Sequence, residues 1–462
     1  MMRSLFFLMM AFWVSGTLAQ DVLTLSLDQS VSLAFENNPE YQMAQKEVAK
    51  ARAGVWQSYS TILPKLDGSA SLQHAWSIQE NTIPNFIKPM LGDLVNIIPE
   101  AQNMPDFVKL SFGLENTLRY GLTLNQPLFL GGAGIAGIRI AKASERIAEL
   151  NLQSQQQSLI YQTSNAFYSC LLAAELIKVQ QQALEQAQAN LELVTKKYNV
   201  GSASGFDQMR AKVEVANLEP ELITAKNNYQ MALTQLRNVL GLEKTTQINV
   251  KGSFEYKSDE FGQLSLIELQ RRAEQNRPEI TQLRAQKQIT KSSVAAARSN
   301  FLPKVVFTTD YSYLAMRNDY EFAQDDFSKG FTSMISLQIP LFQGFKNTKT
   351  YQQAKLDHKI MLDTEKQIRD GIFAQIELAF NGFQEAKEKY QAASESVELA
   401  EESLRLATLM YEEGASTQLD VLNAQLALNR ARLNYVSSLY EYTMARYQLR
   451  QVTGTLEGTL SR

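Results

Sequence analysis

Apolar and polar residues alternate at every second position in four short segments of this chain. The longest runs from Val108 to Asn125, where most even positions are apolar and most odd positions are polar. A spacing of two indicates strands with one apolar and one polar face. A soluble sheet packed on helices would show the same pattern. We predict strands over residues 66–79, 108–129, 303–316 and 329–342.

The segments between the strands have helical spacing instead. Ala133–Asn199 is a run of 67 residues without proline and with two glycines, Gly134 and Gly137, both near its start. As a helix it would extend roughly 100 Å at 1.5 Å per residue. Apolar residues seven positions apart, such as Leu184 and Leu191, are typical of coiled-coil seams. We predict helices over residues 27–59, 133–199, 204–240, 266–300, 346–412 and 417–452, with Asp28 and Ser265 as candidate caps near two of the starts.

The chain also repeats itself. Asn38-Pro39-Glu40 recurs 239 positions later as Arg277-Pro278-Glu279, and Pro127-Leu128-Phe129 recurs 213 positions later as Pro340-Leu341-Phe342. The change of offset indicates about 26 extra residues in the first copy, between Lys65 and Pro127. We therefore predict an internal two-fold repeat, with copies at residues 20–250 and 251–462, each ordered helix, strand, loop, strand, long helix and shorter helix.

Composition excludes several classes of function. The formal net charge is −3, which predicts no nucleic-acid partner. The one cysteine and two histidines form no metal-binding or nucleophilic motif, so we expect no catalytic residues, no cofactor, no metal and no enzyme. Residues 1–19 have the basic start, apolar core and small-residue end of a signal peptide, and no other stretch has 18 apolar residues. We expect an exported protein.

Four amphipathic strands cannot close a barrel alone. Single-chain bacterial barrels have at least eight strands, and an open sheet edge cannot lie in lipid. Three chains would supply twelve strands, so we expect a homotrimer embedded in a membrane. The polar faces of the strands would then line an aqueous pore.

Several paired motifs resemble those of the TolC-like outer-membrane efflux protein family. They are the two Leu-Pro-Lys segments at Leu63 and Leu302, the two Pro-Leu-Phe-x-Gly segments ending at Gly131 and Gly344, and the turns that follow Tyr198 and Tyr411. The resemblance implies a mixed, mainly α fold: a trimeric twelve-stranded β-barrel continued by a long antiparallel coiled-coil α-barrel in the periplasm. It implies a passive exit duct for tripartite efflux or type I secretion. The implied partners are a periplasmic adaptor (membrane fusion protein) and an inner-membrane transporter.

The same resemblance implies a gate at the helix tips. The tip turns would lie at Gly201 and Gly414, and Asp420 matches the first carboxylate of the family's periplasmic constriction. The second position is Asn423, a departure that leaves three carboxylates in a trimer where the family pattern has six. The barrel-to-helix junctions would lie at Pro127, Gly131, Gly132, Pro340 and Gly344.

Tyr411 and Asp207 match positions whose polar contacts hold the closed tips together. Ser416 replaces the basic residue often found there, so one such contact is expected to be missing. Simpler interpretations stay open at this point. Tyr411 fits a coiled-coil seam, and Asp207 or Asp420 fits the cap of a helix that follows a turn.

One other class of protein fits much of the pattern. An exported coiled-coil adhesin, or a periplasmic adaptor without a pore, would explain the seven-residue spacing and the signal peptide. It would not explain two strand pairs at matching points of a duplicated chain. The proline-rich insert of residues 80–106 is expected to face the cell exterior.

Overall fold

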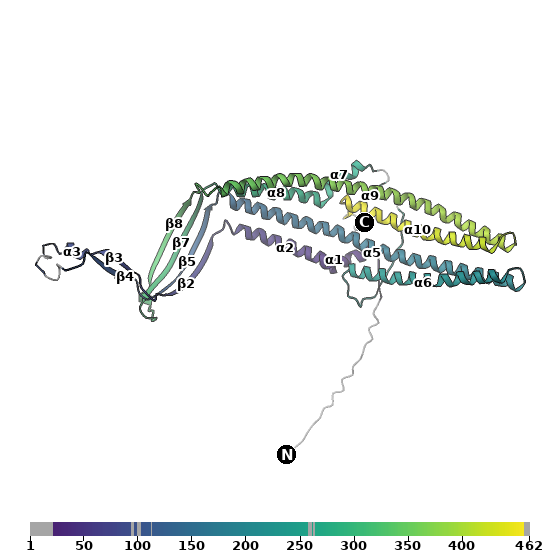
Figure 1. Cartoon of the computed structure of the whole chain (residues 1–462), viewed down its shortest axis with the longest axis horizontal. Helices are drawn as coiled ribbons and strands as arrows, with labels where there is room; N and C mark the ends of the chain where they lie inside the picture. Colours follow the sequence, from purple (N-terminus) through teal and green to yellow (C-terminus); the bar gives the residue numbers. More distant parts are fainter. Residues whose placement is uncertain are drawn as a thin grey trace, which may run out of the picture. The chain divides into compact units, whose positions relative to one another are not determined.

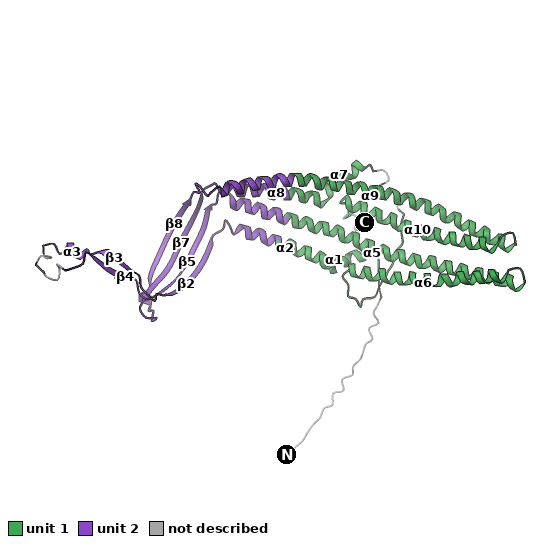
Figure 2. Ribbon diagram, in the orientation of Figure 1, with its two compact units in different colours: residues 1–50, 146–285, 363–462 green, residues 51–145, 286–362 purple. Residues whose placement is uncertain are grey.

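The computed structural model describes residues 22–93, 97–98, 103–111, 113–256, 261 and 264–456. The predicted signal peptide, residues 1–19, lies outside the described residues. The chain divides into two compact units (Figure 2): unit 1 comprises residues 1–50, 146–285 and 363–462, and unit 2 comprises residues 51–145 and 286–362.

Unit 2 contains a four-stranded antiparallel sheet. Its strands are β2 (Lys65–His74), β5 (Asn116–Phe129), β7 (Lys304–Arg317) and β8 (Ser328–Gln338), in the order β2-β5-β7-β8 (Figure 1). In the described residues, β2 and β8 each pair on one side only.

The register of the sheet separates an apolar face from a polar one. One cross-strand row runs Leu66, Leu124, Thr309 and Ser333, and the next runs Asp67, Thr123, Asp310 and Thr332. On the polar face, Asp310 accepts hydrogen bonds from the hydroxyls of Thr123 (2.9 Å) and Ser312 (2.9 Å). On the apolar face, Tyr120 stacks on Tyr313 with ring centroids 5.3 Å apart. The alternation in the sequence thus becomes a two-faced sheet.

The strand predicted over 108–129 is interrupted, so that prediction was wrong. The structure forms β4 (Phe107–Ser111) and then β5 from Asn116. Gly113, at φ 131°, has a backbone that L side chains rarely adopt, and it separates the two strands. β4 pairs with β3 (Glu80–Pro84) in a separate hairpin that also carries the short helix α3 (Ile87–Met90), so the first predicted strand ends at His74 rather than 79.

Four long helices form two pairs of equal length. α5 (Ala133–Asn199) and α9 (Lys346–Glu412) have 67 residues each, and α6 (Gly205–Val239) and α10 (Gln418–Val452) have 35 each. In the described ranges, no helix is both long enough and apolar enough to cross a membrane.

The two helices predicted over 27–59 and 266–300 are each divided in two. α1 (Leu27–Asn37) precedes α2 (Pro39–Tyr59), and α7 (Leu266–Asn276) precedes α8 (Pro278–Ser299). A proline at the first helical position disfavours helical backbone in the residue before it, and Asn38 and Arg277 are accordingly extended. Ser265 caps α7 as predicted, but Ser26 caps α1 and Asp28 lies in its first turn.

Both units also contain short elements that hydrophobic spacing did not predict. In unit 1, β1 (Leu23–Leu25) pairs in parallel with β6 (Ile248–Val250). In unit 2, a short 3-10 helix, η2 (Gln324–Asp326), precedes β8. β1 and β6 contribute to a core that includes Phe167 and Cys170. Burial raises the pKa of the Cys170 thiol to about 12, so the group stays protonated and unreactive near neutral pH.

The predicted junction residues lie at or beside strand ends. Pro127 lies at an irregularity in the pairing of β5 with β7, Pro340 follows β8, and Gly131, Gly132 and Gly344 have positive φ angles of 62°, 87° and 55°. A Cβ atom on Gly131 would lie 2.7 Å from the Ser299 carbonyl oxygen, whereas one on Gly132 would meet nothing within 4 Å.

Gly131→Ala is therefore expected to destabilise the junction more than Gly132→Ala. Both substitutions are expected to lower the free energy of unfolding by about 1–2 kcal/mol, because alanine is unfavourable in left-handed backbone. Only the first also forces the α8 carboxyl end to move. Thermal unfolding of the purified variants in detergent measures this difference. Equal melting temperatures would contradict the close contact.

Candidate functional site at the helix tips

Both long hairpins end in the same kind of turn. At the end of α5, the Ser202 N–H donates to the Lys197 carbonyl (2.8 Å) and the Gly201 N–H to the Tyr198 carbonyl (2.9 Å). At the end of α9, the Ala415 N–H donates to the Met410 carbonyl (2.8 Å) and the Gly414 N–H to the Tyr411 carbonyl (3.2 Å). Gly201 and Gly414 have φ angles of 77° and 76°. These are Schellman caps, which require the left-handed backbone that glycine adopts readily.

The two aspartates after the turns begin the returning helices. Ser204 is the N-cap of α6, and its backbone N–H and hydroxyl donate to the Asp207 carboxylate at 3.2 and 2.6 Å. Thr417 is the N-cap of α10 and donates in the same way to Asp420, at 2.9 and 2.7 Å. Each pair is a capping box. The capping interpretation of Asp207 and Asp420 thus has direct geometric support.

The tips of the two hairpins are connected by residues that the sequence did not indicate. Lys197, in the last turn of α5, donates from Nζ to the carbonyls of Tyr411 (2.7 Å) and Glu412 (3.0 Å). The same Nζ lies 4.7 Å from the centroid of the Tyr411 ring. The carboxyl end of a helix attracts cations because its last carbonyls are unpaired. Lys197 therefore holds the end of α9 against the end of α5.

A second connection runs in the opposite direction. Gln418, in the first turn of α10, is buried and donates from Nε2 to the Asp207 carbonyl (2.9 Å). The expected contact partners Tyr411 and Asp207 are thus brought together, but the Asp207 carboxylate is engaged by Ser204. Burial, and then the negative charge of Asp207, raise the pKa of Tyr411, so the phenol stays neutral.

An apolar cluster lies beneath these polar contacts. Val194, Ala211, Tyr411 and Val421 are its buried members, one from each of the four long helices. Tyr411 is 7% exposed, so it is also the seam residue that its spacing predicts. Its side chain packs inside the cluster while its carbonyl accepts from Lys197. A single residue thus links packing of the hairpins to their polar connection.

Asp420 and Asn423 are both exposed and lie three residues apart on α10, which places them on one face of the helix. The Thr417 hydroxyl, and then the Thr417 backbone N–H, lower the pKa of Asp420 below its ordinary value. Its carboxylate is therefore ionised near neutral pH. In the described residues, no group of three or more acidic, histidine or cysteine side chains has the arrangement of a metal site.

This cap predicts acid sensitivity at the second tip. Because the folded-state pKa of Asp420 is lowered, its contribution to stability is complete above the ordinary value of 3.8 and is lost as the pH falls through the lowered value. We expect the first turn of α10 to exchange its amide hydrogens faster below about pH 4, after correction for intrinsic rates. Asp420→Asn should remove this pH dependence. An unchanged acid response in that variant would assign the effect to another group.

Long capped helical hairpins joined to a two-faced, four-stranded sheet define a class: subunits of outer-membrane channels. The model of the outer membrane efflux protein family matches residues 30–242 and 269–455, and the chain belongs to this family.

Named relatives agree with this assignment. The chain is 23% identical to the outer membrane protein TolC of Escherichia coli, over 74% of this chain and 70% of TolC. It is 24% identical to the alkaline protease secretion protein AprF of Pseudomonas aeruginosa, over 96% of this chain and 88% of AprF. A solved structure of CusC has the same fold, with a TM-score of 0.74 at 18% identity, and covers 94% of this chain and 93% of that one.

The resemblance inferred from the paired motifs is thus confirmed. The protein is an outer-membrane exit channel of the kind that serves efflux or secretion systems, and it extends into the periplasm.

Proposed function

We propose that three copies of the chain close into one continuous duct. The observation that carries this proposal is the sheet β2-β5-β7-β8, whose outer strands each pair on one side only in the described residues. Three sheets joined edge to edge supply twelve strands, which is within the range of membrane barrels. Closure also removes the open edges that lipid does not tolerate. The row containing Asp67 and Asp310 then faces the aqueous lumen.

The helices continue this duct as a coiled-coil barrel built from an internal repeat. The matched lengths of α5 with α9 and of α6 with α10 support a repeat, as do the parallel breaks before Pro39 and Pro278. We place a signal peptide at residues 1–19 and the two repeats at 20–250 and 251–462. The duct conducts passively and carries out no chemistry.

The tips form the periplasmic gate. Lys197 and Gln418 connect the two hairpins of one subunit, with Tyr411 and Asp207 between them. Asp420 of three subunits forms the constriction, and Asn423 stands beside it as a neutral residue. The capping bonds fix the backbone at Asp420 while its carboxylate keeps its charge.

The partners are a periplasmic adaptor and an inner-membrane transporter, with outer-membrane lipid around the barrel. Support comes from the relatives, one of which is an alkaline protease secretion protein and another a cobalt-zinc-cadmium resistance protein. The cargo is set by the transporter that the duct serves.

Planar-bilayer recording tests this function. Purified protein is expected to insert from detergent and produce discrete single-channel steps. An adhesin or adaptor without a pore would remain soluble without detergent and produce no steps, and that result would contradict the proposal.

Asp420→Asn is expected to lower the preference of the channel for cations over anions, because it removes the three carboxylates of the constriction. Reversal potentials in a salt gradient measure the preference, and Asn423→Asp should shift it in the opposite direction. An unchanged reversal potential in both variants would remove these residues from the pore.

A further inference from the structure

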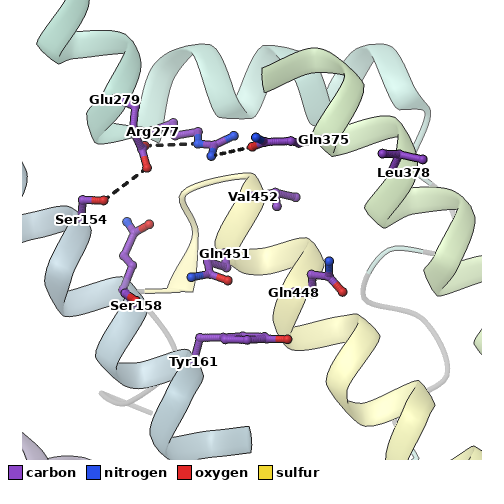
Figure 3. Close-up of a pocket in the computed structure, with 11 residues that line it drawn as sticks. Ser154, Ser158, Tyr161, Arg277, Glu279, Gln375, Leu378, Gln448, Gln451 and Val452 are labelled. Atoms are coloured by element: carbon purple, nitrogen blue, oxygen red, sulfur yellow. Dashed lines mark hydrogen bonds and ion pairs between the residues drawn. The ribbon is translucent and has the colours of Figure 1, made fainter. Parts of the chain in front are cut away.

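A polar cavity of about 470 Å³ lies in unit 1, at the end of α10 away from the tip. Residues of α5, α9, α10 and the α7–α8 junction line it (Figure 3). Arg277, Glu279 and Gln375 lie on one side, and Tyr161 and Gln448 on the opposite side. None of its lining residues belongs to the gate or to the sheet.

Arg277 is the only cation among the described residues that line the cavity, and one of its donor groups is unused. Its side chain is 12% exposed. Nε donates to Glu279 (3.1 Å) and Nη2 donates to Gln375 (3.0 Å). Nη1 is buried and has no hydrogen-bond partner in the described residues. A buried donor without an acceptor is unfavourable, so the Arg277 side chain gains if a small rotation brings Nη1 to an acceptor in the cavity that the residue lines.

Glu279 carries the one carboxylate among the described lining residues, and it does not supply that acceptor. Both oxygens of Glu279 are engaged, one by Arg277 Nε and the other by the Ser154 hydroxyl at 3.2 Å. Gln375 accepts through Oε1, which leaves its amide nitrogen to donate. Gln451 adds another amide nitrogen to the lining. The wall therefore offers amide nitrogens beside the guanidinium, together with the amide oxygens of Gln448 and Gln451.

The matching position of the first repeat shows that the local fold does not require an arginine. Asn38 occupies it, and its side chain donates to the Val239 carbonyl (3.0 Å) and accepts from the N–H groups of Glu40 (2.9 Å) and Tyr41 (3.1 Å). The amide thus satisfies the same helix break entirely within the chain. Arg277 adds a positive charge and an unused donor at the same break.

We propose that this cavity binds a small oxyanion, a phosphate or carboxylate group, through Arg277. A guanidinium binds such groups with two parallel N–H donors, and amide nitrogens from α9 and α10 would complete the contacts. A bound oxyanion would connect four separate elements of unit 1. The site goes beyond the proposed conduction and does not depend on it.

Calorimetric titration of the detergent-purified full chain tests the site. Inorganic phosphate and acetate are the probes, with sodium chloride of equal ionic strength as the reference. We expect saturable binding of at least one probe. Arg277→Asn, which installs the residue of the first repeat, should weaken it at least tenfold, because a charge-assisted hydrogen bond is lost. Gln451→Glu should also weaken it, by placing a carboxylate in the wall without changing its shape.

Arg271→Gln is the matched control. It removes the same charge from α7, but Arg271 is exposed and pairs with Glu268, outside the cavity. We expect it to bind like the unaltered chain. Binding of neither probe would overturn the proposal, as would equal affinity in the unaltered chain and Gln451→Glu. That second variant decides the matter if Arg277→Asn does not fold.

Discussion

Replacing Lys197 with methionine is expected to raise the open probability of the channel by about thirtyfold. The substitution removes two charge-assisted hydrogen bonds to the last carbonyls of α9 and the contact with the Tyr411 ring. At this half-buried position we assign about 2 kcal/mol to their combined loss, which is about a thirtyfold shift between closed and open tips. Single-channel recording in planar bilayers measures the shift.

Lys196→Met is the control for this prediction. It makes the same chemical change one residue earlier, where the ammonium group is exposed and pairs with Glu192 on its own helix at 2.7 Å. Its open probability should match that of the unaltered channel. If Lys197→Met also matched, the connection between α5 and α9 would not hold the gate closed.

Ile335→Arg is expected to abolish stable insertion into the outer membrane. Ile335 is 67% exposed and lies near the middle of β8 on the apolar face of the sheet. A charge at this depth on the lipid side of a barrel is unfavourable by about 2–4 kcal/mol per subunit, and the cost recurs in each copy of the assembly. Fractionation of the membranes, followed by electrophoresis without heating, measures how much assembled protein they contain.

Ser336→Arg tests the face rather than the position. Ser336 lies one residue further along β8, at nearly the same depth, but it lies on the polar face and pairs with Val306. The variant should assemble and change only the ion preference of the pore. Equal loss of assembly in both variants would mean that the two faces do not meet lipid and water as proposed.

The sequence predicted the long helices well because their ends carry strong local signals. The predicted bounds of 133–199 and 346–412 coincide with α5 and α9, since uninterrupted helical runs end there in glycines with positive φ. The breaks at Asn38 and Arg277 were missed although a proline follows each. Apolar spacing continues across them, and it hid the boundary that the proline sets.

The candidate site was predicted only in part. Gly201, Gly414 and the capping role of Asp207 and Asp420 follow from local sequence. The contact of Lys197 with Tyr411 does not, because it joins residues 214 positions apart and depends on which faces of two hairpins meet. One feature of the sequence pointed to Lys197, its position in the last turn of a predicted helix, but that position does not indicate which residue the lysine contacts. β1 and β6 were missed because three residues are too few to show a period.

The central claim is a gated duct made of three subunits. Its most direct test is single-channel recording from channels assembled from a mixture of unaltered and Lys197→Met chains. Each channel then contains from zero to three altered subunits. We predict four classes of channel that differ in open probability, with proportions that follow the mixing ratio binomially. A different number of classes would contradict the trimer, and channels that all behave alike would contradict the gate at the tips.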